Sequence, residues 1–183
     1  GGSLASVGEA DEEAQPDGSF LTGTATVNIL GTSAIHGSVY GSGRGVASPK
    51  EEYKQAAYVK NTLVNVSGGH VFQNVFGGGN AGHVRRNTDV TINGTAKVDG
   101  NVYGGGAGDI SSPTAGLVNH DVVVNILGGL IAGDVYGGGA IANTNVHDKR
   151  NTGTYGNPSE DVFATTKVNL TGGIILGDAY GGG

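Results

Sequence analysis

The sequence has no cysteine, no methionine, only 4 prolines and few charged residues. Without cysteine there can be no disulfide framework, no zinc–thiolate site and no thiol chemistry. The absence of methionine, even at position 1, predicts a processed product or an excised piece of a longer protein. Charged residues make up 14% of the chain, and the formal net charge is −6. This balance argues against a nucleic-acid binder, which needs a basic stripe.

Long apolar runs are also missing. No stretch reaches the roughly 18 apolar residues of a membrane helix, and no signal-peptide pattern opens the chain. We therefore expect no membrane span in this chain. Glycine, by contrast, is abundant, with 37 copies in 183 residues. Because there is no Gly-X-Y period and little proline, this abundance does not indicate collagen.

The glycines belong to an internal repeat with five copies. Each copy has a short apolar–polar–apolar segment such as Val27-Asn28-Ile29, a Gly-Gly or Gly-Thr pair, a second apolar segment, and a Val-Tyr or similar pair followed by glycines. Alternation predicts strands with one buried face, whereas this density of glycine disfavours helix by about 1 kcal/mol per residue. We number the copies units 1 to 5: residues 24–43, 64–79, 90–106, 124–139 and 168–183.

Very short strands joined by tight corners predict an all-β fold, a single-stranded parallel β-helix (β-solenoid) of about five coils with loop insertions. Residues 1–18 are acidic and aperiodic and read as a linker or disordered leader, so the β-helix would span 19–183. Ser48-Pro49 has the pattern of a helix start, which predicts a short helix in the first insertion. Unit 5 ends without a polar cap, so we expect the natural protein to continue beyond residue 183.

Equivalent positions should form columns. The apolar positions of the first segment should line the interior, and the polar position between them should point outward because side chains alternate along a strand. This outward column either forms a hydrogen-bonded amide ladder or offers a flat polar face to a glycan or another ordered surface. Its members are Asn28, Asn65, Thr91, Asn125 and Asn169.

A second column is aromatic. Each aromatic follows a small aliphatic residue, and we favour the aliphatic member facing inward. The aromatics would then form either a buried stack or an exposed platform on which sugar rings stack. The tyrosines of this candidate surface are Tyr40, Tyr103, Tyr136 and Tyr180, with Phe76 at the unit 2 position.

Polar residues stand at the corner before each Val-Tyr pair. They are expected to satisfy turn amides. Two of them, Asp134 and Asp178, are also weak Ca²⁺ candidates, although the nonapeptide calcium-binding order is absent. The closing glycines, Gly138 among them, are expected to need a conformation that only glycine adopts. No other metal and no cofactor are expected.

No catalytic motif stands out. The sequence lacks a phosphate-binding P-loop and paired histidines of the H-E-x-x-H type, and the outward column holds amides and hydroxyls that neither abstract nor donate protons well. We therefore predict no catalytic residues and no enzyme activity. The alternative is a carbohydrate-active β-helix enzyme of the polysaccharide lyase or hydrolase type, or a glycan-binding fragment of one.

The repeated V-N-[I/V/L]-x-G-G and D-V-Y-G-G-G elements resemble units of large secreted or surface-anchored bacterial proteins of the adhesin and autotransporter-passenger type. The resemblance covers residues 24–183. It implies a right-handed parallel β-helix outside the cell that acts as a stalk or contact surface. It supplies no catalytic residues. Because the stacked array holds no reactive constellation, we expect weak, multivalent contact with a glycan or a host or cell-surface protein. Because uncapped strand edges are sticky, end-to-end self-association is a further expectation.

Overall fold

The computed structural model describes residues 7, 23–47, 57–112, 114–146 and 163–183. The acidic leader, apart from Val7, and the start of the helix predicted from Ser48 lie outside these residues. The described chain is all-β, and every pair of named strands is parallel. No helix in this part of the chain is long and apolar enough to cross a membrane.

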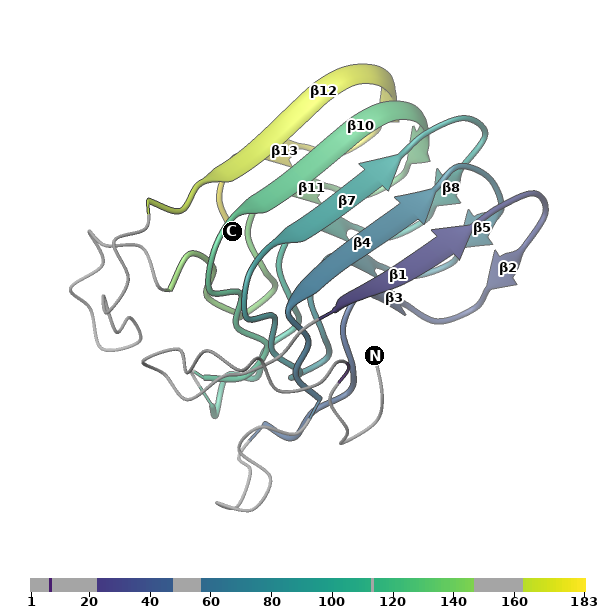
Figure 1. The fold of residues 1–183 in the computed structure, drawn as a ribbon. Helices are drawn as coiled ribbons and strands as arrows, with labels where there is room; N and C mark the ends of the chain where they lie inside the picture. Colours follow the sequence, from purple (N-terminus) through teal and green to yellow (C-terminus); the bar gives the residue numbers. More distant parts are fainter. Residues whose placement is uncertain (1–6, 8–22, 48–56, 113, 147–162) are drawn as a thin grey trace.

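The strands form two sheets (Figure 1). The first sheet contains β1 (Thr24–Ile29), β2 (Ala34–Ile35), β4 (Asn61–Val66), β5 (His70–Val71), β7 (Thr88–Ile92), β8 (Lys97–Val98), β10 (Val122–Ile131) and β12 (Thr166–Ile175). The second contains β3 (Val39–Tyr40), β6 (Val75–Phe76), β9 (Val102–Tyr103), β11 (Val135–Tyr136) and β13 (Ala179–Tyr180).

The prediction of a single-stranded parallel β-helix is wrong. The eight-stranded sheet curls into a half-barrel, and the five-stranded sheet is a separate layer. The difference arises at the glycine pairs, which we expected to be tight corners between two short strands. In units 4 and 5 the strands β10 and β12 run through the pair without a break, each for 10 residues. The first and second apolar segments therefore belong to one continuous, curled sheet.

Consecutive units pair in register within both sheets. Val27 pairs with Val64, Val64 with Val90, Val90 with Val124, and Val124 with Val168. This pairing confirms that like positions form columns. It also means that the interior aliphatic side chains of an inner unit, such as Val90, meet aliphatic side chains on both sides.

The hydrophobic core lies between the concave face of the curled sheet and the second sheet. Val64, Val90, Val124 and Ile126 have no exposed surface, which confirms the interior columns for the inner units. The valines of the second sheet, Val39 among them, belong to the same core. Burial of this kind stabilises a fold by about 25 cal/mol per Å² of apolar surface.

The connections between units gather on one side, opposite the bend of the curled sheet (Figure 1). They are also stacked, because Val84 makes parallel bridges to Val59 and to Val118. These three valines form a second, smaller cluster with Ala25 and Val122. The described parts of these connections therefore continue the stack of units.

Glycine serves two different purposes in each unit. At the bend of the curled sheet, Gly69, Gly129 and Gly173 have positive φ, a conformation that glycine adopts at low cost. Gly138, by contrast, has no positive φ, so the predicted reason for its glycine is wrong. A Cβ at Gly138 would instead lie 2.8 Å from the backbone nitrogen of Gly183 in the next unit. The closing glycines are required by the close approach of neighbouring units.

Candidate functional site

The aromatic column forms a continuous stack on the outer face of the second sheet. Neighbouring ring centroids lie 4.8–5.0 Å apart, with interplanar angles of 4–8°. The preceding valines, such as Val135, point into the core, which confirms the predicted facing. From unit 1 to unit 5 the rings are Tyr40, Phe76, Tyr103, Tyr136 and Tyr180.

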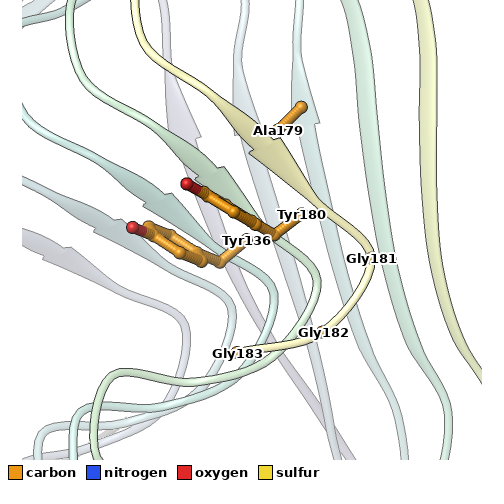
Figure 2. Close-up of a pocket in the computed structure, with 6 residues that line it drawn as sticks. All are labelled: Tyr136, Ala179, Tyr180, Gly181, Gly182 and Gly183. Atoms are coloured by element: carbon orange, nitrogen blue, oxygen red, sulfur yellow. The ribbon is translucent and has the colours of Figure 1, made fainter.

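The rings cover one another's faces. Phe76 is 3% exposed and Tyr180 is 44% exposed, whereas Tyr40, Tyr103 and Tyr136 are intermediate. Along the row the stack therefore presents ring edges and hydroxyl groups rather than faces. Figure 2 shows its unit 5 end, where the Tyr180 ring lies over Tyr136 beside the chain of 181–183. A cavity of about 570 Å³ opens at this end.

The corner residues before the aromatic pairs form a ladder of side-chain to backbone hydrogen bonds. In each step a side-chain oxygen accepts the backbone N–H of the equivalent residue in the next unit, over 2.8–3.2 Å. This confirms the prediction that these residues satisfy turn amides. The ladder runs through Ser38, Asn74, Asn101, Asp134 and Asp178.

The corner ladder also contacts the tyrosine hydroxyls. Tyr136 donates to Asp134 Oδ2 over 2.9 Å, and Tyr180 donates to Asp178 Oδ2 over 3.1 Å. The backbone N–H of Asp178, and then the Tyr136 hydroxyl, lower the pKa of Asp134. The hydrogen bond to Asp134 in turn raises the pKa of Tyr136 to about 12, and that to Asp178 raises the pKa of Tyr180.

We call the Tyr136–Asp134 and Tyr180–Asp178 pairs the tyrosine–carboxylate row. At neutral pH both of its phenols are protonated, and Asp134 is ionised. Both oxygens of Asp134 already accept hydrogen bonds. Among the described residues, no group of three or more His, Asp or Glu side chains could hold a metal ion. Calcium binding by Asp134 and Asp178 stays a prediction.

The predicted amide column lies on the convex face of the curled sheet. Asn65 donates to Asn28 over 2.9 Å, and Asn169 donates to Asn125 over 2.8 Å. Thr91 interrupts the run of amides, and Asn125 reaches its hydroxyl over 3.4 Å. The column is therefore an amide ladder in two sections, and its use as a surface for glycan stays a prediction.

A second corner ladder was missed by sequence reasoning. Side-chain oxygens of Asn61, Asn87 and Asp121 each accept the backbone N–H of the equivalent residue in the next unit, over 2.7–3.2 Å, and Thr165 is the last donor. The sequence feature that could have revealed it is an Asn or Asp at the start of the first strand of units 2 to 4: Asn61 begins β4, and Asn87 and Asp121 directly precede β7 and β10. This ladder fixes the entry into the curled sheet.

Sequence reasoning also missed a charged cluster outside the bend of the curled sheet. His70 Nε2 lies 2.8 Å from Asp99 Oδ2, and Lys97 Nζ lies 3.0 Å from the other carboxylate oxygen. These partners, Lys97 before His70, lower the pKa of Asp99. The His70 ring also stacks on Phe72 with centroids 3.8 Å apart, and the other neighbour of Phe72 is His36 at 4.6 Å. The sequence feature that could have revealed this cluster is that His70 and Lys97 occupy paired positions in units 2 and 3.

A third cluster lies among the connections. The rings of Tyr58 and His83 stack 4.5 Å apart, and the Arg85 guanidinium lies 4.4 Å from the Tyr58 centroid. Burial of the imidazole, and then the charge of Arg85, lower the pKa of His83 to about 4. His83 is therefore neutral near pH 7, and its ring packs as part of the structure.

No family model, no curated protein and no solved structure matches this chain. The site is therefore interpreted from its geometry alone.

Proposed function

We propose that this chain is a structural and interaction module of a bacterial surface or secreted protein. It acts as an adhesin-like stalk or binding surface that makes weak, multivalent contacts outside the cell. The observation that carries the proposal is the repetition of polar side chains at equivalent positions of stacked units on the outer faces of the two sheets. The module's partners in this proposal are a glycan or a host or cell-surface protein on the side of the stack, and further copies of itself at the ends.

The tyrosine–carboxylate row supports a glycan more than an apolar partner. The carboxyl groups of Asp134 and Asp178 offer acceptor oxygens on adjacent units, with tyrosine hydroxyls beside them. Sugar hydroxyls donate to carboxylates, and hydrogen bonds to charged groups contribute about 1.5–3 kcal/mol each. Equal spacing along the row suits a polymer, since several weak contacts to one chain act together.

The test is a glycan array followed by titration of any hit with wild-type protein and the Asp134→Asn variant. Asparagine keeps the oxygen that accepts the N–H of Asp178 but removes the charge. We expect Asp134→Asn to weaken glycan binding about tenfold, the effect of losing one charged contact. Asp121→Asn, in the second corner ladder, is the matched control: it also removes one charge and keeps the oxygen that accepts the N–H of Thr165, and it should bind glycan like wild type. A blank array, together with a blank pull-down from host surface proteins, would reduce the module to a spacer.

The alternative, a carbohydrate-active enzyme, has one observation in its favour. His70, Lys97 and Asp99 combine a base, a cation and a carboxylate within hydrogen-bond distance on an outer face. General acid–base chemistry on a sugar needs such groups. Incubation with assorted polysaccharides, with assays for reducing ends and unsaturated products, tests this alternative. Activity that His70→Ala abolishes would favour it over the binding module.

A further inference from the structure

The turn at residues 93–96 joins β7 to β8 at the bend of the curled sheet (Figure 1). Asn93 and Gly94 are both exposed in this turn. Asn93 is the one asparagine in the 183-residue sequence that a glycine directly follows. The turn therefore combines an accessible side-chain amide with a following residue that has no side chain to shield its backbone nitrogen.

The Asn93 amide lies against that nitrogen. The backbone N–H of Gly94 donates to Asn93 Oδ1 over 2.7 Å. Because Cγ is bonded to Oδ1, the electrophilic carbon of the amide is close to the Gly94 nitrogen as well. The χ2 torsion of asparagine has a broad energy well, so rotation of the exposed amide turns the face of Cγ toward the nitrogen. The turn holds a nucleophile and an electrophile side by side.

The Gly94 nitrogen is not part of the backbone ladders. In the described part of the chain, no backbone carbonyl accepts its N–H. By contrast, the nitrogens that follow Asn74 and Asn101 donate to backbone carbonyls of the next unit, each over 2.9 Å. A nitrogen in a ladder must lose its hydrogen bond before it can attack a side chain, and the Gly94 nitrogen has no such bond to lose.

Unit 1 has the same turn with leucine in place of asparagine, because Leu30-Gly31-Thr32 corresponds to Asn93-Gly94-Thr95. Gly31 and Gly94 have φ of 60° and 58°. In both turns the fourth residue donates its N–H to the carbonyl of the first, over 3.3 Å in unit 1 and 3.2 Å in unit 3. The turn therefore forms without asparagine, and unit 1 supplies a matched comparison.

From this geometry we infer that Asn93 is a site of spontaneous deamidation, with water as the only reactant. The Gly94 nitrogen loses its proton to solvent and bonds to Asn93 Cγ. The bond from Cγ to Nδ2 breaks, and Nδ2 takes a proton from solvent and leaves as ammonia. Water then opens the cyclic succinimide at either carbonyl, which leaves aspartate or isoaspartate at position 93 with no change in oxidation state.

Both products change the bend. Each adds a negative charge, and isoaspartate also lengthens the backbone by a methylene group. The turn packs closely between its neighbours, since a Cβ at Gly128 would lie 2.9 Å from the Gly94 nitrogen and a Cβ at Gly94 would strike the Ser67 carbonyl. The isoaspartate form should therefore melt at a lower temperature than the unmodified chain. The modification goes beyond the proposed function and does not depend on it.

The test incubates the folded 183-residue chain over a pH series above neutrality. Released ammonia is measured, peptide mass spectrometry locates the converted residues, and a methyltransferase specific for isoaspartate labels that product. Wild type is expected to convert at Asn93 while Asn74 and Asn101 keep their amides. The rate should rise in proportion to the hydroxide concentration, because the Gly94 nitrogen must lose its proton to form the ring. Anion exchange separates the more acidic products for melting.

Two exchanges between units 1 and 3 make the test specific. Asn93→Leu copies unit 1 and should abolish conversion at position 93 with an unchanged melting temperature. Leu30→Asn places the same residue pair in the unit 1 turn and should create a second site that reacts about as fast as Asn93. The inference is overturned if Asn93 of the folded wild type keeps its amide as long as Asn74 and Asn101 do. It is also overturned if position 30 of folded Leu30→Asn stays unmodified, because the turn would then not promote the reaction.

Discussion

Units 4 and 5 have nearly the same sequence but different surroundings. Ile126 and Val135 of unit 4 are fully buried between neighbours, whereas Leu170 of unit 5 is about half exposed. The glycines differ in the same way, since a Cβ at Gly137 would collide with a neighbouring unit and one at Gly181 would not. The comparison shows that an adjacent unit buries the inward-facing side chains. The same adjacent unit leaves no space for a Cβ at the closing glycines.

The largest expected effect comes from placing a charge in the interior column. Ile126→Asp would bury an unpaired carboxylate and should cost more than the about 5 kcal/mol that many domains have in total, so the chain should not fold. Leu170→Asp, in the same column of unit 5, should cost about 1 kcal/mol because water reaches that site. Circular dichroism melting measures both. Equal losses in the two variants would contradict the contrast between units.

The next effect concerns the closing glycines. Gly137→Val should destabilise the fold by about 3 kcal/mol or more, because its Cβ would strike the backbone of unit 5. Gly181→Val should change the free energy of unfolding by less than about 0.5 kcal/mol, because a Cβ at position 181 would meet nothing within 4 Å. Denaturant titration gives both values. If Gly181→Val were as harmful as Gly137→Val, the glycine requirement would lie in backbone conformation after all.

A smaller effect is expected at the buried threonine of the long strands. Thr88 is 1% exposed and donates to the Gly104 carbonyl over 2.7 Å. Thr88→Val should cost about 1–3 kcal/mol by leaving that carbonyl without its donor. Val122 occupies the position in unit 4 that pairs with Thr88. The reverse exchange, Val122→Thr, would add a hydroxyl donor beside Gly137, and its loss in the free energy of unfolding should be smaller. Equal costs for the two exchanges would show that the hydrogen bond contributes nothing.

Much of this arrangement could be predicted from the sequence because the repeat is periodic. Alternation in Val27-Asn28-Ile29 and its equivalents predicts which side chains face inward, and repetition predicts the register in which the units pair. The prediction failed where glycine had two possible effects. A Gly-Gly pair can end a strand or bend it, and only the neighbouring strands decided that β10 and β12 continue through theirs.

The candidate site was predictable only in part, because spacing identifies columns but not what each column contacts. The corner hydrogen bonds were anticipated, yet the direct bond from Tyr136 to Asp134 depends on the turn geometry between them. The cluster of His70 and Asp99 joins different units at adjacent positions, so no local motif contains both. Insertions of unequal length hid that adjacency in the linear sequence.

The smallest expected effect concerns the ionisation of the tyrosine–carboxylate row. The hydrogen bond to Asp134 raises the pKa of Tyr136 to about 12. Because the folded pKa lies above the ordinary value of 10.0, the stabilisation is complete below pH 10 and is lost as the pH rises through about 12. Absorbance titration of tyrosinate in wild type and Asp134→Asn measures the shift. The variant should bring the Tyr136 pKa back toward 10.0 because it removes the charge that opposes phenol ionisation. An unchanged curve would show that the hydrogen bond from Tyr136 to Asp134 does not form in solution.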